Sequence, residues 1–143
     1  MSLQSLIRRE VVTQPPTATC LDAAELMRDR RVGSIVVVED EQPLGVVTDR
    51  DLVLRVMLER RNPERVFLRE VMSENPIFLS HRRSLTDAVE TMRDLRVRRL
   101  PIVDDRQRLV GIVTLDDVLM HLARLTDALG RAVELELGPP PAG

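Results

Sequence analysis

The sequence predicts a mixed α/β fold in which one β-α-β-β-α unit occurs twice and an extended helix follows the second copy. Three observations carry this prediction: an internal repeat, the alternation of extended and helical patterns inside each repeat, and an apolar periodicity that continues beyond the second copy. The chain has 143 residues, of which 43% are hydrophobic. That length and composition suffice for a core in one compact domain or in two half-sized units.

Two halves of the chain align with each other at a spacing of 65 residues, which becomes 66 after a one-residue insertion. The pair Asp22-Ala23 recurs as Asp87-Ala88, and the tetrapeptide Gly45-Val46-Val47-Thr48 recurs as Gly111-Ile112-Val113-Thr114. Repetition at a fixed spacing indicates one supersecondary unit used twice. We therefore expect each half to contain the same elements in the same order.

Each unit begins with a short extended segment and a helix capped by a small polar residue. Thr19 opens the first helix and Ser84 the second, because a hydroxyl there can accept a hydrogen bond from the first turn. An apolar run without polar alternation follows and predicts a strand buried on both faces. A polar turn then leads to a further strand and a second helix. The predicted elements are Val11–Thr13, a helix from Thr19, Ser34–Val38, Leu44–Thr48 and Asp49–Arg60 in the first unit, and Ile77–Leu79, a helix from Ser84, Leu100–Val103, Leu109–Thr114 and a helix from Leu115 in the second.

The two units are predicted to meet at Asn62-Pro63-Glu64, with a short helical turn over Leu68–Met72. These boundaries divide the chain into residues 1–61 (first unit), 62–70 (linker), 71–125 (second unit) and 126–143 (helix extension and proline-rich tail). Proline has no N–H to donate, so we expect the tail from Gly138 to be frayed.

Charge and cysteine content argue against several classes of function. Basic and acidic side chains number 21 and 23, which gives a net charge of −2, so we expect no direct nucleic-acid binding. The single cysteine, Cys20, excludes an internal disulfide and a cysteine-cluster metal site, and it fits a reducing cytoplasm. We interpret Cys20 as a small buried hydrophobe and expect no bound metal and no membrane span. Every basic residue is arginine, which indicates a GC-rich bacterial genome.

The repeated motif combines a glycine, two apolar residues, a threonine and, three residues later, an aspartate. It occupies Gly45–Asp51 in the first unit and Gly111–Asp117 in the second. A threonine at the point where a strand becomes a helix lies beside free backbone N–H groups, which stabilise a phosphate. One turn later the carboxylate returns to the same side and can accept both hydroxyls of a ribose. The same spacing is also an ordinary capping pattern, but its double occurrence favours a binding site.

The strand order, the repeat and these motifs resemble a tandem pair of cystathionine β-synthase (CBS) domains, also called a Bateman module. The strings Val47–Leu52 and Val97–Asp104 carry the resemblance, which extends from about Leu3 to about Leu122. It implies two repeats packed with pseudo-two-fold symmetry and a regulatory module that is not an enzyme. It also implies ligands in clefts between the repeats, namely AMP, ADP, ATP or S-adenosylmethionine, with no obligatory cofactor.

The resemblance assigns roles to individual residues of this sequence. Thr48 and Thr114 would bind phosphate or ribose oxygens, and Asp51 and Asp117 would bind the ribose hydroxyls. The adenine would be walled by Val12, Ile77, Ser34, Ile35, Arg99, Leu100 and Pro101.

The two sites are not expected to be equivalent. Arg50 lies inside the first motif and suits a phosphate, whereas Asp116 occupies that position in the second motif and repels one. Arg98 or Arg99 can compensate for Asp116. We expect the first site to favour a phosphorylated ligand and the second to be weaker or to take a less charged one.

The last helix continues beyond what the repeat needs. Its apolar residues are spaced four, three, four and three apart, which is typical of a helix that packs on another helix. They are Val118, Leu122, Leu125, Leu129 and Ala132. We therefore expect a homodimer, and a regulated protein of unknown identity as a further partner.

These features fit three functions to different degrees. The leading hypothesis is a nucleotide-sensing module whose output is a ligand-dependent change of conformation. The alternative is a dimeric interaction scaffold with vestigial clefts, although both motifs retain their threonine and aspartate. An oxidoreductase that uses a dinucleotide is not expected, because the glycine-rich turn of that fold and a cluster of nucleophile and base are missing from the sequence.

Overall fold

The computed structural model describes residues 2–73, 78–138 and 141–142 of the chain. The first repeat contains strand β1 (Thr13–Gln14), helix α1 (Cys20–Arg30), strands β2 (Ser34–Glu39) and β3 (Gln42–Thr48), helix α2 (Asp49–Leu52) and a π-helical segment, η2 (Val53–Met57). The second contains α3 (Leu68–Val71), β4 (Leu79–Ser80), α4 (Leu85–Leu95), β5 (Arg99–Val103), β6 (Leu109–Thr114) and α5 (Leu115–Leu137). A short 3-10 helix, η1 (Leu3–Leu6), precedes both repeats.

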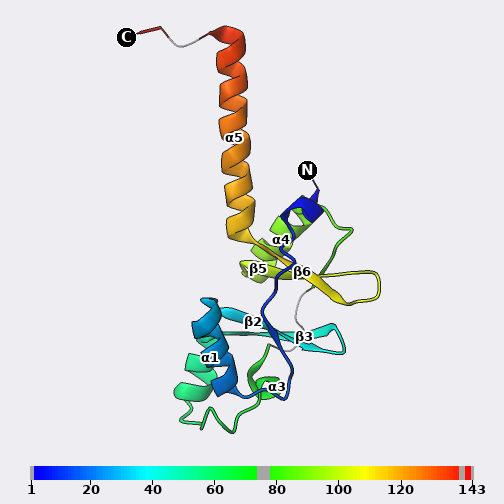
Figure 1. Ribbon diagram of the computed structural model, residues 1–143, viewed down its shortest axis with the longest axis vertical. Helices are drawn as coiled ribbons and strands as arrows, with labels where there is room; N and C mark the ends of the chain where they lie inside the picture. Colours follow the sequence, from blue (N-terminus) through cyan, green and yellow to red (C-terminus); the bar gives the residue numbers. More distant parts are fainter. Residues whose placement is uncertain (1, 74–77, 139–140, 143) are drawn as a thin grey trace.

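The strands form two three-stranded sheets of the same design, in the orders β1-β2-β3 and β4-β5-β6. In each sheet the first pair of strands is parallel and the second pair antiparallel. The sheets lie next to each other at the centre of the molecule, with α1 and α3 beyond one sheet and α4 beyond the other (Figure 1). The predicted α/β fold, with one unit used twice and a long C-terminal helix, is confirmed.

Both predicted helix caps are present. The Thr19 hydroxyl accepts a hydrogen bond from the Asp22 N–H at 3.1 Å, and the Asp22 carboxylate accepts one from the Thr19 N–H at 3.0 Å. Ser84 and Asp87 repeat this arrangement at the start of α4. Such a reciprocal pair satisfies two N–H groups that would otherwise lack partners. The hydroxyl residues therefore mark both helix starts correctly.

Two elements differ from the expected ones. Strand β1 begins two residues later than the predicted segment Val11–Thr13. In place of the predicted helix Asp49–Arg60, the structure has a single α-helical turn, α2, followed by the π-helical segment η2. The helical structure ends at Met57. The Leu58 N–H donates to the carbonyl five residues before it, that of Val53, at 2.9 Å, which widens the helix into a π turn.

Each repeat has its own aliphatic core, and each core also includes residues from the N-terminal side of the other repeat. Leu3, which is 1% exposed, and Ile7 pack in the core of the second repeat, while Val66 and Leu68 pack in the core of the first. The N-terminal segment thus runs from the second repeat to the first (Figure 1). Residues 62–70, expected as a linker, therefore contribute to a core. Cys20 is buried in the first core, as predicted.

The glycine of the repeated motif is required by these crossing segments. A Cβ at Gly111 would lie 2.2 Å from Ile7 Cγ2 and 2.6 Å from the Arg8 carbonyl oxygen. A Cβ at Gly45 would lie 2.8 Å from Met72 Sδ. Only a residue without a side chain allows the chain to pass so close to the strand. The motif glycines thus allow the crossing segments to pack against β3 and β6.

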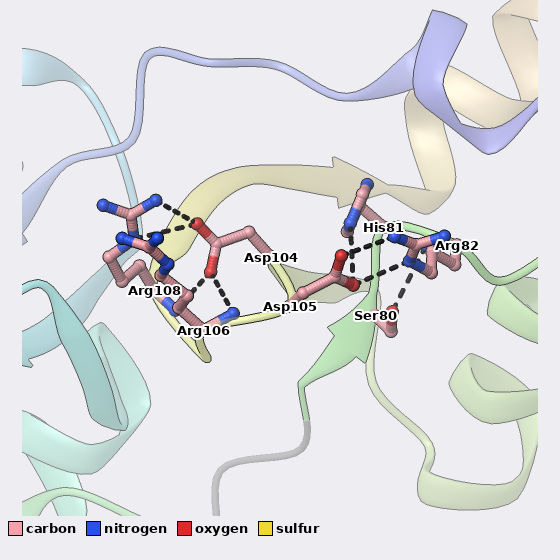
Figure 2. A network of polar contacts seen from close by, with 7 residues as sticks. All are labelled: Ser80, His81, Arg82, Asp104, Asp105, Arg106 and Arg108. Atoms are coloured by element: carbon pink, nitrogen blue, oxygen red, sulfur yellow. Dashed lines mark hydrogen bonds and ion pairs between the residues drawn. The ribbon is translucent and has the colours of Figure 1, made fainter.

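The one-residue insertion lies in the turn between β5 and β6, where an acidic pair organises the chain. Asp104 accepts hydrogen bonds from the N–H groups of Arg106 and Arg108, both at 2.9 Å. Asp105 reaches the residues that follow β4, with Arg82 Nε at 2.7 Å and His81 Nε2 at 3.3 Å (Figure 2). These contacts tie the turn to the loop before α4.

Helix α5 extends away from both sheets (Figure 1). Its first turn packs on the second core through Val118, whereas Leu122, Leu125 and Leu129 are 46%, 45% and 60% exposed. It ends at Leu137, just before the proline-rich tail. Among the described residues, no helix combines the length and the low charge that a bilayer span requires.

Candidate functional site

A cleft of about 270 Å³ lies between the two repeats. The first repeat contributes the residues that lead into β1 and the turn from α1 into β2. The second repeat contributes the start of β5, the end of β6 and the first turn of α5. The cleft therefore lies where the resemblance places a ligand, and the crossing N-terminal segment completes its wall.

Four of the predicted site residues line this cleft: Val12, Ser34, Arg99 and Thr114. Val12 comes from the segment before β1, and Ser34 and Arg99 open the middle strands of the two sheets. Thr114 ends β6 and caps α5. Residues from both halves of the chain are thus brought to one cavity, as the tandem arrangement predicts.

Two predicted wall residues, Ile35 and Leu100, do not line this cleft. Both are fully buried, Ile35 in the first core and Leu100 in the second. Successive side chains of a strand point to opposite faces, so the residues next to Ser34 and Arg99 face the cores. Ile35 and Leu100 thus lie behind the lining of this cleft, and the adenine contact that the resemblance assigns to them stays a prediction. Pro101 is also buried and does not line it, and Ile77 lies outside the described residues.

Thr114, Asp117 and Arg8 form a polar group at the edge of the cleft. The Thr114 hydroxyl accepts a hydrogen bond from the Asp117 N–H at 3.1 Å. The Asp117 carboxylate accepts a hydrogen bond from the Arg8 guanidinium through Oδ1, while its Oδ2 is buried and has no hydrogen-bond partner within the described part of the chain. Arg8 is fixed by its backbone, whose N–H and carbonyl both pair with Ile112 at 2.9 Å.

The surroundings of Asp117 set its charge. Burial raises the pKa of this carboxyl, but hydrogen bonds from Arg8 and Thr114 and the positive charge of Arg8 together lower the pKa below its ordinary value. The pKa of Arg8 is raised by the same hydrogen bond and charge. Asp117 is therefore ionised at neutral pH, the form in which both carboxylate oxygens accept hydrogen bonds.

In the first motif, Thr48 and Asp51 form a closed capping box. The Asp51 carboxylate accepts hydrogen bonds from the Thr48 N–H at 2.8 Å and from the Thr48 hydroxyl at 3.0 Å. The Asp51 N–H donates to the same hydroxyl at 3.1 Å. The Arg50 side chain is exposed and does not line the cleft. The capping interpretation that the sequence left open is thus realised at this motif.

The charges around the cleft favour an anion. Asp116 lines the cleft, but Arg98 Nη2 lies 2.8 Å from its Oδ1, so the compensation that the sequence allowed is present. Arg31 and Arg99 also line the cleft, and neither forms an ion pair with another described residue. Including Glu10, the lining carries three arginines and two acidic side chains.

Sequence reasoning missed two of the arginines that line the cleft, Arg8 and Arg31. Arg8 contacts a carboxylate 109 residues away, so no local spacing relates the two residues. Arg31 ends α1 in the left-handed conformation with φ 54°, and its counterpart Arg96 ends α4 in the same way. The sequence does contain a signal for Arg31. An arginine-containing turn follows each of the two helices, and the repeat places Arg31 and Arg96 at equivalent positions.

Comparison with known proteins supports the same organisation. The family model of the CBS domain matches residues 3–58 and 68–124. An uncharacterized protein of Methanopyrus kandleri is 42% identical over 120 residues, which cover 83% of this chain and 61% of that protein. A CBS domain-containing protein of Bacillus subtilis is 38% identical over 120 residues, which cover 84% of each chain.

A solved structure shares the fold. It is a CBS domain protein from Pyrobaculum aerophilum complexed with AMP, with a TM-score of 0.75 at 26% identity. The match covers 87% of this chain and 99% of that one. This chain spans less than two thirds of the length of the Methanopyrus relative, but the two family matches include most of its own residues. The chain therefore belongs to the CBS domain family, as a tandem pair of CBS domains.

Proposed function

We propose that this CBS pair binds an adenosine nucleotide, AMP, ADP or ATP, in the cleft between its repeats and passes the binding on to a regulated partner protein. The observation that carries the proposal is the position of Thr114 and Asp117 at the N-terminus of α5, next to a cleft lined by arginines. The AMP bound by the related Pyrobaculum aerophilum protein supports the choice of ligand.

Each part of such a ligand has a partner in the cleft. The phosphate lies at the start of α5, where the Thr114 hydroxyl and the positive end of the helix dipole stabilise an anion. Arg31 and Arg99 offer guanidinium groups that bind two phosphate oxygens at once. Asp117 accepts hydrogen bonds from the ribose hydroxyls, and Val12 contributes to an apolar wall for the adenine. S-adenosylmethionine, which carries a positive sulfonium, fits this lining less well.

We also propose a second cleft, related to the first by the repeat. Thr48 and Asp51 would take the places of Thr114 and Asp117, and Arg50 would bind the phosphate. Asp51 must then leave part of its capping box, which makes binding there more costly. Because Arg98 neutralises Asp116, we expect the Thr114 cleft to accept a phosphate as well, in place of the less charged ligand expected from the sequence.

The output of this module is conformational and requires no bond-making step. A ligand shifts a conformational equilibrium only by its differential affinity for the two states. The cleft is built from both repeats, so a bound nucleotide fixes their relative position. Helix α5 starts at the cleft and carries Leu125 and Leu129 on an exposed apolar seam. We propose that this seam joins two copies in the cytoplasm and transmits the ligand state to the regulated protein.

A second candidate, an interaction scaffold with vestigial clefts, is favoured by one specific observation. Both motif aspartates already have partners inside the chain: Asp51 closes a capping box, and Asp117 binds Arg8. In a scaffold these contacts are the only role of the aspartates. In a sensor they are exchanged for contacts to the ligand.

Thermal unfolding with AMP, ADP, ATP, S-adenosylmethionine and NAD separates the two candidates. A ligand present at about 100 times its dissociation constant adds about 2.7 kcal/mol to the stability of the protein. We expect an adenosine nucleotide to stabilise the wild type and to lose this effect in Asp117→Ala. The matched control is Asp22→Ala, which removes an equivalent capping carboxylate from α1, away from the cleft.

The comparison is made between each variant with and without ligand, so a general loss of stability does not disturb it. If millimolar concentrations of all five compounds leave the wild type unchanged, the nucleotide proposal is wrong and the scaffold stands. If Asp22→Ala and Asp117→Ala lose the ligand effect equally, Asp117 acts only through the fold.

A further inference from the structure

The Asp117 carboxylate that the proposed function assigns to the ribose is already held by Arg8. The Arg8 side chain is 65% exposed, whereas the Asp117 side chain is 13% exposed. Arg8 lines the cleft, and its backbone is fixed by two hydrogen bonds to Ile112. The Arg8 guanidinium can therefore change its orientation while the Arg8 backbone stays fixed, and the Asp117 carboxylate stays in place.

This contact distinguishes the second motif from the first. In the repeat alignment Arg8 corresponds to Ser73, whose hydroxyl donates to the Val46 carbonyl at 3.2 Å. Asp51 consequently turns back to its own capping residue. The equivalent hydrogen bond from the Thr114 N–H to the Asp117 carboxylate is missing, although the Thr114 hydroxyl still accepts one from the Asp117 N–H. The Arg8 guanidinium takes the place of the Thr114 N–H as a donor to the Asp117 carboxylate.

We propose that Arg8 is a specificity-determining residue that makes this cleft select phosphorylated nucleosides over nucleosides. The inference rests on the proposed function, because it assumes that Asp117 accepts the ribose hydroxyls. The ribose hydroxyls of a nucleoside must displace the Arg8 guanidinium from the Asp117 carboxylate. A nucleoside has no anionic group that could bind the displaced guanidinium. A nucleotide brings a phosphate that replaces the carboxylate as the partner of Arg8.

The geometry supports this exchange of partners. Arg8 and Thr114 line the same cleft, and Thr114 marks the helix start at which a phosphate is stabilised. A guanidinium binds phosphate and carboxylate with the same planar arrangement of donors. Movement of one exposed side chain is therefore enough to pass from the pair with Asp117 to a pair with the ligand.

Calorimetric titration of the whole chain with AMP and with adenosine tests the proposal. The variants are Arg8→Ala, Arg8→Lys, Asp117→Asn and, as the matched control, Arg9→Ala, which alters the neighbouring arginine outside the cleft. The binding step that disappears in Asp117→Asn identifies this cleft. For that step we expect Arg8→Ala to lower the preference for AMP over adenosine by about tenfold or more, the size of one charge-assisted hydrogen bond.

The loss is expected in AMP binding, with adenosine bound as well as before or more tightly. Arg8→Lys keeps the positive charge but loses the planar arrangement of donors, so it should retain part of the preference for AMP over adenosine. Arg9→Ala should retain all of this preference. An unchanged preference in Arg8→Ala, or an equal loss for both ligands, overturns the role of Arg8 and leaves the proposed function intact. If the wild type binds neither AMP nor adenosine, the proposed function fails and this inference fails with it.

Discussion

At the scale of single residues, an aspartate three positions after a hydroxyl residue has two different environments in this chain. Four such pairs stand at the start of a described helix, where three of the aspartates close a capping box and one does not. The closed boxes contain Asp22, Asp51 and Asp87, and the open one contains Asp117. The spacing between the hydroxyl residue and the aspartate is the same in all four cases. The difference arises from Arg8, which is distant in sequence and close in space.

The Asp105 ion pair gives a prediction about pH. Hydrogen bonds from Arg82, followed by that from His81, lower the pKa of Asp105 from its ordinary value of 3.8 to about 2 (Figure 2). Because the folded pKa lies below the unfolded one, this pair favours the folded state above about pH 3.8 and stops doing so as the pH falls through about 2. We expect the Asp105 carboxyl carbon to titrate near pH 2 by NMR in the wild type.

Two arginine variants check the cause of that shift. Arg82→Ala removes both guanidinium hydrogen bonds and should move the titration of Asp105 up toward 3.8. Arg106→Ala alters the same turn, but its contact is a backbone N–H to Asp104, so the titration of Asp105 should stay where it is. A midpoint that responds equally to both substitutions contradicts the assigned cause.

At the scale of elements, a glycine of strand β6 and a glycine of helix α5 should respond in opposite ways to alanine. Gly111→Ala places a Cβ against Ile7 and the Arg8 carbonyl, and should destabilise the fold by about 1–3 kcal/mol. Gly130→Ala on α5 meets nothing within 4 Å and should stabilise the helix by up to about 1 kcal/mol. Urea unfolding of both variants measures these changes. A Gly111→Ala protein as stable as the wild type would mean that the N-terminal segment does not pack on β6.

Most elements of this fold could be predicted from local sequence. Thr19 and Ser84 mark the helix starts, and the apolar runs at β2 and β5 mark the buried strands, because caps and burial act on neighbouring residues. The π turn at Val53–Met57 could not be predicted, since its residues are ordinary helix residues and the wider turn results from a shifted hydrogen bond. The lining of the cleft was harder to predict. It depends on which face of a strand each side chain occupies and on the N-terminal segment that crosses between the repeats.

Strand faces and long-range contacts explain the errors at the site. Ser34 and Arg99 line the cleft, whereas Ile35 and Leu100, which were expected on the same wall, face the cores because the next residue of a strand points the other way. Arg8 could not be predicted, because its contact depends on how the N-terminal segment crosses to the second repeat. A sequence repeat indicates which helices and strands exist, but it does not indicate which of them contact each other in the folded protein.

At the scale of the whole molecule, the exposed seam of α5 gives a prediction about assembly. Leu125→Glu with Leu129→Glu places two charges on the proposed contact between copies and should yield monomers in light scattering, where we expect the wild type to be a dimer. The control, Arg131→Glu, introduces the same acidic residue on the opposite side of the helix and should remain dimeric. A dimer that survives the double substitution shows that the seam is not the contact.

A crystal structure of the chain grown with saturating AMP tests whether the cleft between the repeats binds an adenosine nucleotide. We predict AMP in the cleft, with its phosphate at the start of α5 near Thr114, its ribose hydroxyls on Asp117 and the Arg8 guanidinium turned from Asp117 to the phosphate. An empty cleft with the pair of Arg8 and Asp117 intact, or AMP bound elsewhere on the surface, would contradict the account.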